Sequence, residues 1–216
     1  MGVLEILLPP ACAGCGRFGH VVCQGCVAAF RVAAAPADRF AAADPGTIVG
    51  DALELAIAAF AHNGAMRRAL QRLKYGGSGR VGVPLARAAA PALEALVQVS
   101  GSLPLVPVPV HAARLRQRGY NQAALLANAL GSELGLPVLD ILERRRPTAR
   151  QHGLGKGARL RNLRGAFSLR GGVLPPQQLI LVDDILTTSA TLESCAQVLR
   201  ASGAASVYGF AIAREV

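Results

Sequence analysis

Residues 179–191 read LILVDDILTTSAT, and this stretch decides the fold class and the candidate site. The apolar, β-branched run from Leu179 to Val182 predicts a buried strand. Two adjacent carboxylates, Asp183 and Asp184, follow at its end. After them comes a loop of small and hydroxyl-bearing residues: Thr187, Thr188, Ser189, Ala190 and Thr191.

The next residues predict a helix, because Leu192, Cys195 and Leu199 recur on one face. A strand, an acidic pair, a hydroxyl-rich turn and a helix N-terminus together favour a site for a phosphorylated sugar. The helix start offers unpaired N–H groups and a positive dipole end to a phosphate. The carboxylates can accept hydrogen bonds from ribose hydroxyls and help to hold Mg²⁺. The alternative is a buried strand whose aspartates only cap the helix; Cys195 is predicted to be a small core residue.

The rest of the chain alternates short apolar strands with helical patterns, which predicts an α/β fold with a parallel sheet flanked by helices. The 216 residues and 52% hydrophobic content allow one ordinary domain with a small appendage. In such sheets ligands bind at the carboxyl ends of the strands. Strands are expected at 53–61, 103–110, 138–142, 166–169, 179–182 and 206–213, and helices at 64–75, 81–98 and 120–134.

Four of the five cysteines form two Cys-x-x-Cys pairs, Cys12 with Cys15 and Cys23 with Cys26. Each pair, with a glycine to relax its turn, can present two thiolates to one metal, so the spacing favours a structural, tetrahedral Zn²⁺ site. Two disulfides or a redox motif are the alternatives. His20 lies between the pairs, but the four sulfurs already complete the coordination shell.

The composition shifts after the cysteines, and this shift predicts the domain organisation. Residues 1–30 are expected to form the zinc-binding module, 31–50 an Ala- and Pro-rich linker, and 51–216 the main domain. The start of the chain is a poor signal peptide, and no apolar run is long enough to span a membrane. We therefore expect a reducing, cytoplasmic compartment, which disfavours disulfides.

The net charge of +10 comes almost entirely from arginine, which suits bidentate phosphate contacts. One segment concentrates it without an intervening acid: Arg144, Arg145, Arg146, Arg150, Lys156, Arg159, Arg161 and Arg164. Such a segment should attract pyrophosphate or nucleic acid. No aromatic residue interleaves it, which weakens a base-stacking picture, and an arginine-rich genome would produce the same composition.

The stretch at 179–191 resembles the signature of type I phosphoribosyltransferases: four apolar residues, two acids, two apolar residues and Thr-Thr-Gly-x-Thr. Ser189 stands where that family usually has glycine. The resemblance implies a type I phosphoribosyltransferase-like sheet and a site for 5-phosphoribosyl-1-pyrophosphate. In that site Asp183 and Asp184 would be the catalytic pair facing the ribose O2′ and O3′, and residues 187–191 would wrap the 5-phosphate.

Three further segments are similar to the ComF family, whose members join a short cysteine module to a phosphoribosyltransferase domain. They are PVPVHAARLRQRGYNQ at 107–122, the QHGL…RLRNLRGAF run at 151–167, and LKYGG at 73–77. The resemblance implies a role in natural competence, in which single-stranded DNA is handled as it enters the cell. A DNA-uptake helicase is then an expected partner, and Arg144, Arg145, Arg146 and Arg150 are the expected nucleic-acid contacts.

In this superfamily the loop after the first core strand holds pyrophosphate, and here that place falls at residues 109–112. His111, Arg114, Arg118 and Lys74 are therefore the expected pyrophosphate contacts. Each has an ordinary alternative: a capping role for His111, a solvated helix face for the arginines, and a lysine extended toward water at a helix end for Lys74. Tyr120 and Asn121 are expected at most to brace the loop.

Three functions remain open at this point. The first is a Mg²⁺-dependent phosphoribosyltransferase, an enzyme of the glycosyltransferase class, acting alone in nucleotide metabolism on an acceptor that the sequence does not identify. The second is a protein of DNA uptake that uses the same fold to bind phosphoribosyl pyrophosphate or ribose 5-phosphate. A regulator built on this fold is a weaker third option, since no helix-turn-helix is visible.

Overall fold

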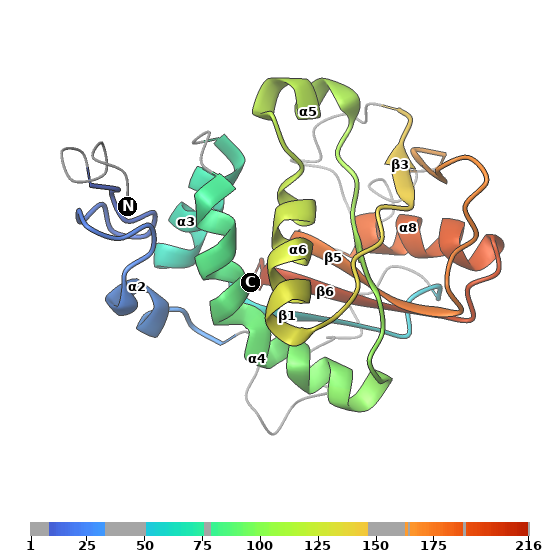
Figure 1. Cartoon of the computed structure of the whole chain (residues 1–216), viewed down its shortest axis with the longest axis horizontal. Coiled ribbons are helices and arrows are strands. Elements are labelled where there is room, and N and C mark those ends of the chain that lie inside the picture. The colour runs from blue at the N-terminus through green and yellow to red at the C-terminus, as the bar shows by residue number, and fades with distance from the viewer. Residues whose placement is uncertain are drawn as a thin grey trace.

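The computed structural model describes residues 9–32, 51–75, 79–146, 163, 165–187 and 189–215. Strands and helices alternate along these ranges, which confirms the predicted α/β class (Figure 1). In chain order the elements are α2 (Gln24–Ala28), β1 (Leu55–Ala61), α3 (Gly64–Tyr75), η2 (Gly79–Val81), α4 (Gly82–Ser100), β2 (Leu105–Pro107), α5 (Ala112–Arg118), α6 (Gln122–Leu134), β3 (Leu142–Arg144), β4 (Phe167–Leu169), β5 (Gln178–Leu186), α8 (Ala190–Ala201) and β6 (Ser206–Arg214).

The main sheet has four strands in the order β1-β6-β5-β2, and all its pairings are parallel. The carboxyl ends of neighbouring strands therefore meet at one edge. Pro107 of β2 is opposite Val182 of β5, and Asp183 is opposite Ala211 of β6. The acidic pair thus lies near the point where β2 ends, as the rule for open parallel sheets predicts for a ligand site.

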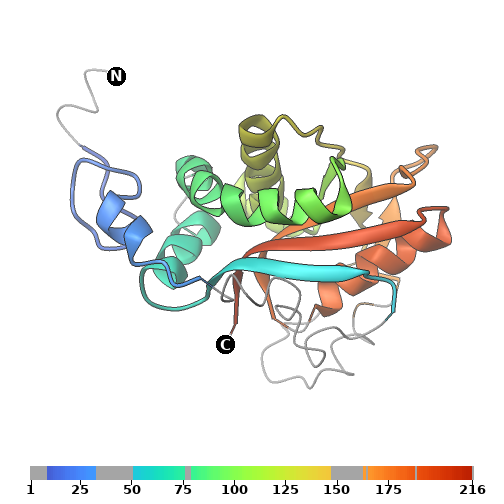
Figure 2. The same cartoon turned by 90° about the horizontal axis from the view of Figure 1, so that it is seen from below.

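Alternate residues of the strands build two separate hydrophobic cores, because successive side chains of a strand point to opposite faces. Ile180 and Val182 pack toward α3, α4 and α6. Leu179 and Leu181 pack toward α8. Figure 2 shows α4 on one side of the strands and α8 on the other. This double cover explains why the strands read as continuous apolar runs rather than as alternating ones.

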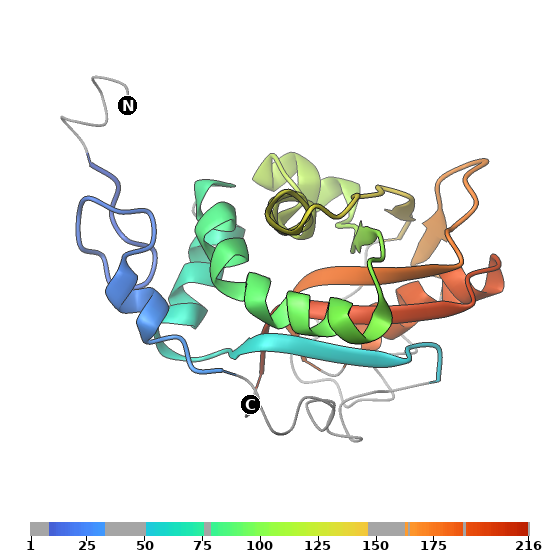
Figure 3. The ribbon, with the colours of Figure 1, turned by 60° about the horizontal axis from the view of Figure 1, so that its bottom comes forward.

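The cysteine module packs against the carboxyl edge of the sheet, beside α3 (Figure 3). The Phe30 ring lies 5.2 Å from that of Phe60 in β1, at a tilt of 56°. Val32 forms an antiparallel bridge with Phe60, and Ala61 N donates to Arg31 O at 2.8 Å. The module therefore shares a hydrophobic core with the sheet and sits at the same edge as the acidic pair.

Two expected strands differ from the structure. The run at 138–142 contributes only a single bridge, from Val138 to Leu105, and the strand begins at Leu142. That strand, β3, pairs with β4 in a separate antiparallel ribbon. The signature strand does not end at Val182 but continues to Leu186, so both acids occupy strand positions. Within the described ranges no helix has the length and apolarity needed to cross a membrane.

Candidate functional site

The two acids of the signature point away from each other across the sheet, because β5 continues through them. Asp184 is buried on the side of α3, with 4% of its surface exposed. Asp183 is partly exposed on the side of α8, and its Oδ1 accepts a hydrogen bond from Asp184 N at 2.8 Å. The pair therefore offers one enclosed carboxylate and one open carboxylate.

Asp184 is held by an ion pair with Lys74, the penultimate residue of α3. The Lys74 Nζ lies 2.8 Å from Asp184 Oδ2, and the two side chains are 21% and 5% exposed. Burial lowers the pKa of Lys74, but the carboxylates of Asp184 and Asp183 more than offset this and raise it, so the ammonium is fully charged. The lysine assigned to pyrophosphate thus contacts the acidic pair.

The ionised form of Asp183 is disfavoured in the free protein. Burial and the neighbouring Asp184 carboxylate raise the pKa of Asp183 to about 8, although Lys74 opposes the shift. Arg144 also lies within electrostatic range of Asp183. Burial, together with the charge of Arg114, lowers the pKa of Arg144. Arg144 is therefore placed near the acidic pair, on the side of α8, while its guanidinium stacks 5.2 Å from the Phe167 ring centroid.

The loop after the acids brings the backbone into the left-handed region at Ser189. Its φ of 55° makes Ser189 the one residue other than glycine with positive φ in the described part of the chain. Ser189 is buried, and its carbonyl accepts the first hydrogen bond of α8, from Glu193 N at 2.8 Å. Thr187 and Thr191 are partly exposed and Ala190 is buried; Thr188 lies outside the described residues. The loop thus delivers the chain directly into the N-terminus of α8.

The loop after β2 is braced by side-chain hydrogen bonds. His111 caps α5, accepting from Ala113 N through Nδ1 at 3.2 Å. Asn121 caps α6 and also donates to Val108 O at 3.0 Å. The Tyr120 hydroxyl donates to Leu73 O in α3 at 2.6 Å. The bracing role expected for Tyr120 and Asn121 is confirmed, and His111 has the capping role that was its alternative.

The arginines that the sequence assigns to phosphate or nucleic acid do not form one cluster among the described residues. Arg118 donates to Gln122 Oε1 at 2.8 Å and lies 5.1 Å from the centroid of the Tyr75 ring. Arg114 is exposed on α5. Arg145 forms an exposed ion pair with Glu143 at 2.8 Å, and Arg146 is exposed after β3. Arg150 lies outside the described residues, as do Lys156, Arg159 and Arg161; nothing is described of the Arg164 side chain.

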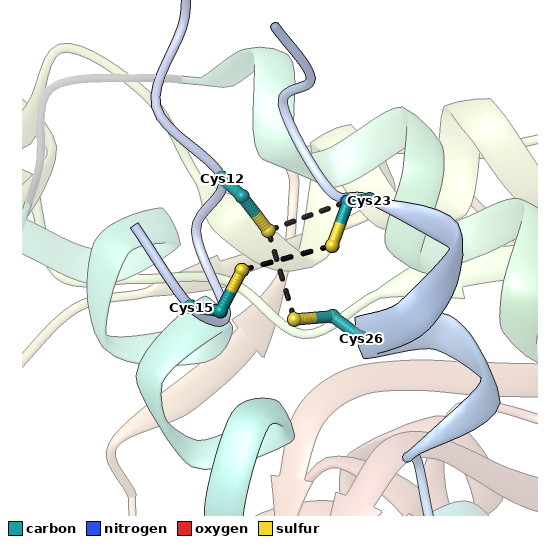
Figure 4. Close-up of side chains that lie close together, drawn as sticks. All are labelled: Cys12, Cys15, Cys23 and Cys26. Atoms are coloured by element: carbon teal, nitrogen blue, oxygen red, sulfur yellow. Dashed lines mark hydrogen bonds between the residues drawn. The ribbon is translucent and has the colours of Figure 1, made fainter. Parts of the chain in front are cut away.

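The four N-terminal cysteines converge on one point (Figure 4). Their sulfur atoms all lie within 4.8 Å of one another, and the Cys12–Cys26 and Cys15–Cys23 sulfur pairs are 3.7 Å apart. A tetrahedral ion with bonds of 2.3 Å to sulfur needs sulfurs about 3.8 Å apart. The cluster therefore has the donor set and the spacing to hold a metal ion. His20 is exposed outside it.

The backbone around the cluster is adapted to the sulfurs. A Cβ on Gly14 would lie 2.6 Å from the Cys26 sulfur, so that only glycine fits there. Cys23 N donates to the Cys12 sulfur at 3.2 Å. Burial alone would raise the pKa of the Cys12 thiol. The hydrogen bond from Cys23 N and those from other backbone N–H groups outweigh the effect of burial and lower the pKa to about 6. Cys195 is fully buried in the core beside α8, as expected.

Two residues that support the site were not singled out from the sequence. Glu193, fully buried in the first turn of α8, accepts from Ala52 N through Oε1 at 3.0 Å. Arg200 donates to Ala52 O through Nε at 3.0 Å. Helix α8 therefore binds both the N–H and the carbonyl of Ala52, in the segment before β1. In the sequence, the only sign of this role is that Glu193 is a charged residue on the apolar side of the predicted helix.

No family model matches the chain. It is 38% identical over 113 residues to "Competence protein F" of Haemophilus influenzae, covering 51% of this chain and 49% of that protein. It is 37% identical over 115 residues to "DNA utilization protein YhgH" of Escherichia coli, covering 52% and 49%. The chain thus spans about half the length of these curated relatives.

A longer match is to "Competence protein ComFC" of Streptococcus pneumoniae, at 31% identity over 157 residues that cover 73% of this chain and 67% of the relative. Among solved structures, Leishmania donovani UMP synthase is similar with a TM-score of 0.32 and 17% identity, over 67% of this chain and 22% of that one. A TM-score this low supports no conclusion about this chain. On the strength of the sequence matches, this chain belongs to the ComF family.

Proposed function

We propose that the carboxyl edge of the sheet binds 5-phosphoribosyl-1-pyrophosphate or ribose 5-phosphate. The observation that carries this proposal is the left-handed backbone of Ser189, between the acidic pair and the start of α8. Glycine adopts that conformation without cost, and the phosphoribosyltransferase signature has glycine there. A serine held in the same conformation keeps the shape of a phosphate loop at an energetic cost, which a functional site explains.

In this site Asp183 takes the ribose hydroxyls first, because its carboxylate is partly exposed. Asp184 reaches the sugar once Lys74 turns toward the anionic ligand, and the ammonium then contacts the pyrophosphate. The 5-phosphate lies at the N-terminus of α8 and is wrapped by residues 187–191. Arg114, Arg118 and the exposed edge of His111 contribute the remaining positive or donor groups around the pyrophosphate.

Carboxylate oxygens are the ligands that Mg²⁺ prefers, so Asp183, whose carboxylate is partly exposed, would hold a Mg²⁺ ion that arrives with the ligand, and Asp184 would join it once Lys74 turns away. Bound there, the ion would neutralise charge on a departing pyrophosphate. The carboxylates would orient the ribose and stabilise positive charge developing at C1′, and the arginines would bind the leaving group. No residue in the described ranges stands out as the base for an acceptor, so the acceptor remains to be found by screening.

Calorimetry tests the ligand directly. Titration with 5-phosphoribosyl-1-pyrophosphate and Mg²⁺ should give one site per chain, and Asp183→Asn should abolish the heat of binding. Arg87→Gln is the matched control, because Arg87 is an exposed charged residue on α4, paired with Glu133. Unchanged binding by Asp183→Asn would exclude the acidic pair as the sugar site. A pyrophosphate-release screen over acceptor bases then asks whether transfer occurs.

We further propose that the protein acts in DNA uptake and handles the incoming single strand. The names of its relatives, competence proteins and DNA utilization proteins, support this role. Arg144, Arg145, Arg146 and Arg150 are the proposed nucleic-acid contacts, the cysteine cluster is proposed to bind structural zinc, and a DNA-uptake helicase is the proposed partner. The alternative, a phosphoribosyltransferase of nucleotide metabolism acting alone, is favoured by the complete acidic pair.

Two sets of variants separate these functions. Asp183→Asn with Asp184→Asn should remove sugar-phosphate binding and leave electrostatic DNA binding intact. Arg145→Gln with Arg146→Gln should weaken DNA binding, make it less dependent on salt, and leave sugar-phosphate binding intact. Arg144 stays unaltered in this test because it lies near Asp183. The separation is wrong if both sets of changes weaken both ligands equally.

A further inference from the structure

Two exposed aromatic rings lie in segments of the chain that carry positive charge and no acid. Phe18 is 74% exposed in the loop between the two cysteine pairs, and Tyr75 is 76% exposed at the end of α3. Residues 9–32 and 64–75 contain no aspartate or glutamate. Single exposed rings are common on protein surfaces, but aromatic rings among basic groups are typical of surfaces that bind unpaired bases.

Contacts of the module's backbone with α3 connect the segments that carry these two rings. Phe18 pairs with Ala11 in an antiparallel bridge, and the Ala11 carbonyl accepts from Arg72 Nη1 at 3.1 Å. Tyr75 follows Arg72 by three residues and therefore lies on the same face of the helix. The Arg118 guanidinium then stacks on Tyr75. A path of contacts thus runs from the cysteine module along α3 to the loop beside the acidic pair.

The arginines along this path keep their charge available. Arg68 Nε and Arg72 Nη1 donate to the backbone carbonyls of Gly14 and Ala11, which carry no net charge and do not neutralise a guanidinium. Arg17, next to Phe18, is exposed. Of the carboxylates in the part of the chain that the structure describes, none forms an ion pair with Arg17, Arg68 or Arg72.

We propose that this strip, made of Arg17, Phe18, Arg68, Arg72, Tyr75 and Arg118, is the surface on which the unpaired bases of a single-stranded nucleic acid stack, in addition to the phosphate contacts proposed at 144–150. The inference rests on the proposed handling of single-stranded DNA and assigns it a place. Guanidinium groups contact the phosphates, and Phe18 and Tyr75 stack on bases. A duplex keeps its bases stacked inside, so the two rings select the unpaired strand. This is the feature that the basic segment at 144–150 lacks.

Fluorescence anisotropy with the zinc-loaded full chain tests the proposal, using a labelled oligothymidine and an abasic strand of the same length. Phe18→Ala should weaken oligothymidine binding roughly 5- to 100-fold, the range for loss of one stacked base. It should leave the abasic strand unaffected, because that strand offers phosphates without bases. Phe18→Trp should retain the affinity. Zinc content, measured on each variant, shows that the module is intact.

The charge of the strip is tested separately with Arg17→Gln. This change should weaken binding of both strands and reduce the slope of log affinity against log salt by about 0.7, the value for one phosphate contact on a single strand. Arg87→Gln removes the same charge from α4, where Arg87 pairs with Glu133, and should change the slope less. A duplex of the same sequence should bind more weakly than the single strand.

Three results would overturn the assignment, and they differ in what they leave standing. If Phe18→Ala and Tyr75→Ala bind oligothymidine as the unaltered chain does, while Arg145→Gln with Arg146→Gln does not, the strip is the wrong surface and single-strand binding survives. Equal losses of Phe18→Ala on the oligothymidine and abasic strands would exclude stacking. If the unaltered chain binds no oligonucleotide at low salt, the proposed DNA handling fails together with the strip.

Discussion

The cysteine cluster and the acidic pair lie at the same edge of the sheet, but they are built in opposite ways. The four sulfurs come from fifteen consecutive residues, 12–26, and lie within 4.8 Å of one another, with a backbone donor beside them. The two carboxylates point to opposite faces, and one of them depends on Lys74 from a distant helix. The first arrangement supplies all four donors of a tetrahedral coordination shell. The second leaves a carboxylate open and its charge unfavourable, as a site that awaits a ligand should.

The largest expected effect comes from breaking the four-sulfur cluster. Cys12→Ser should prevent binding of one zinc per chain and unfold the module, because zinc-finger peptides gain about 10–16 kcal/mol from the metal and a piece this small has little core of its own. Metal analysis and thermal unfolding measure the result. Cys195→Ala, far from the cluster, should keep its zinc. A Cys12→Ser protein with full zinc would show that the sulfurs are not the ligands.

The enclosed half of the acidic pair should matter for stability. Asp184→Asn leaves the Lys74 ammonium, 21% exposed, without its carboxylate, and should lower the free energy of unfolding by roughly 2–3 kcal/mol. Urea unfolding measures the loss. Adding Lys74→Met should recover part of it, because no unpaired charge then remains. Additive losses in the double variant would show that the two side chains do not interact.

Removing the titratable group of Asp183, the partly exposed carboxyl, should have the opposite effect and stabilise the free protein. Burial and the Asp184 carboxylate raise the pKa of Asp183 to about 8, so near neutral pH the folded protein keeps this side chain protonated while the unfolded chain ionises it. This difference destabilises the folded state as the pH rises. Asp183→Asn should therefore raise the melting temperature at pH 8. The sign follows from linkage: the unaltered chain gains stability relative to the variant as the pH falls from 8 toward 4, so the difference should shrink there. A variant less stable at pH 8 would contradict this account.

The smallest effect is expected at the phosphate loop. Ser189→Gly removes the strain of a positive φ, worth about 1–2 kcal/mol, but adds flexibility to the unfolded chain that costs about 0.4–1 kcal/mol. The net gain in unfolding free energy should be below about 1.5 kcal/mol. Ser202→Gly, at a φ of −101° after α8, has no such strain to lose and should not stabilise. Destabilisation by Ser189→Gly would show that the buried hydroxyl contributes more than the strain costs.

The sequence predicted best where the relevant contacts are local. The cysteine cluster follows from two short spacings, and the parallel sheet follows from apolar runs that are covered on both faces. The extension of β5 through the acids was missed, because carboxylates were taken to mark the end of the strand. The ion pair of Lys74 with Asp184 and the position of Arg144 beside Asp183 depend on how distant elements pack. No local pattern encodes those contacts.

Helix α3 links the cysteine cluster to the acidic pair, a site in which no thiol takes part. Its arginines hold the carbonyls of Ala11 and Gly14, and its last turn carries Lys74. Oxidation of the thiols, or a chelator, would detach those carbonyls and remove a support that keeps the ammonium against Asp184. We therefore expect the cell's redox state to alter the proposed affinity for a pentose phosphate, even though the groups proposed to contact the sugar are themselves inert to oxidants.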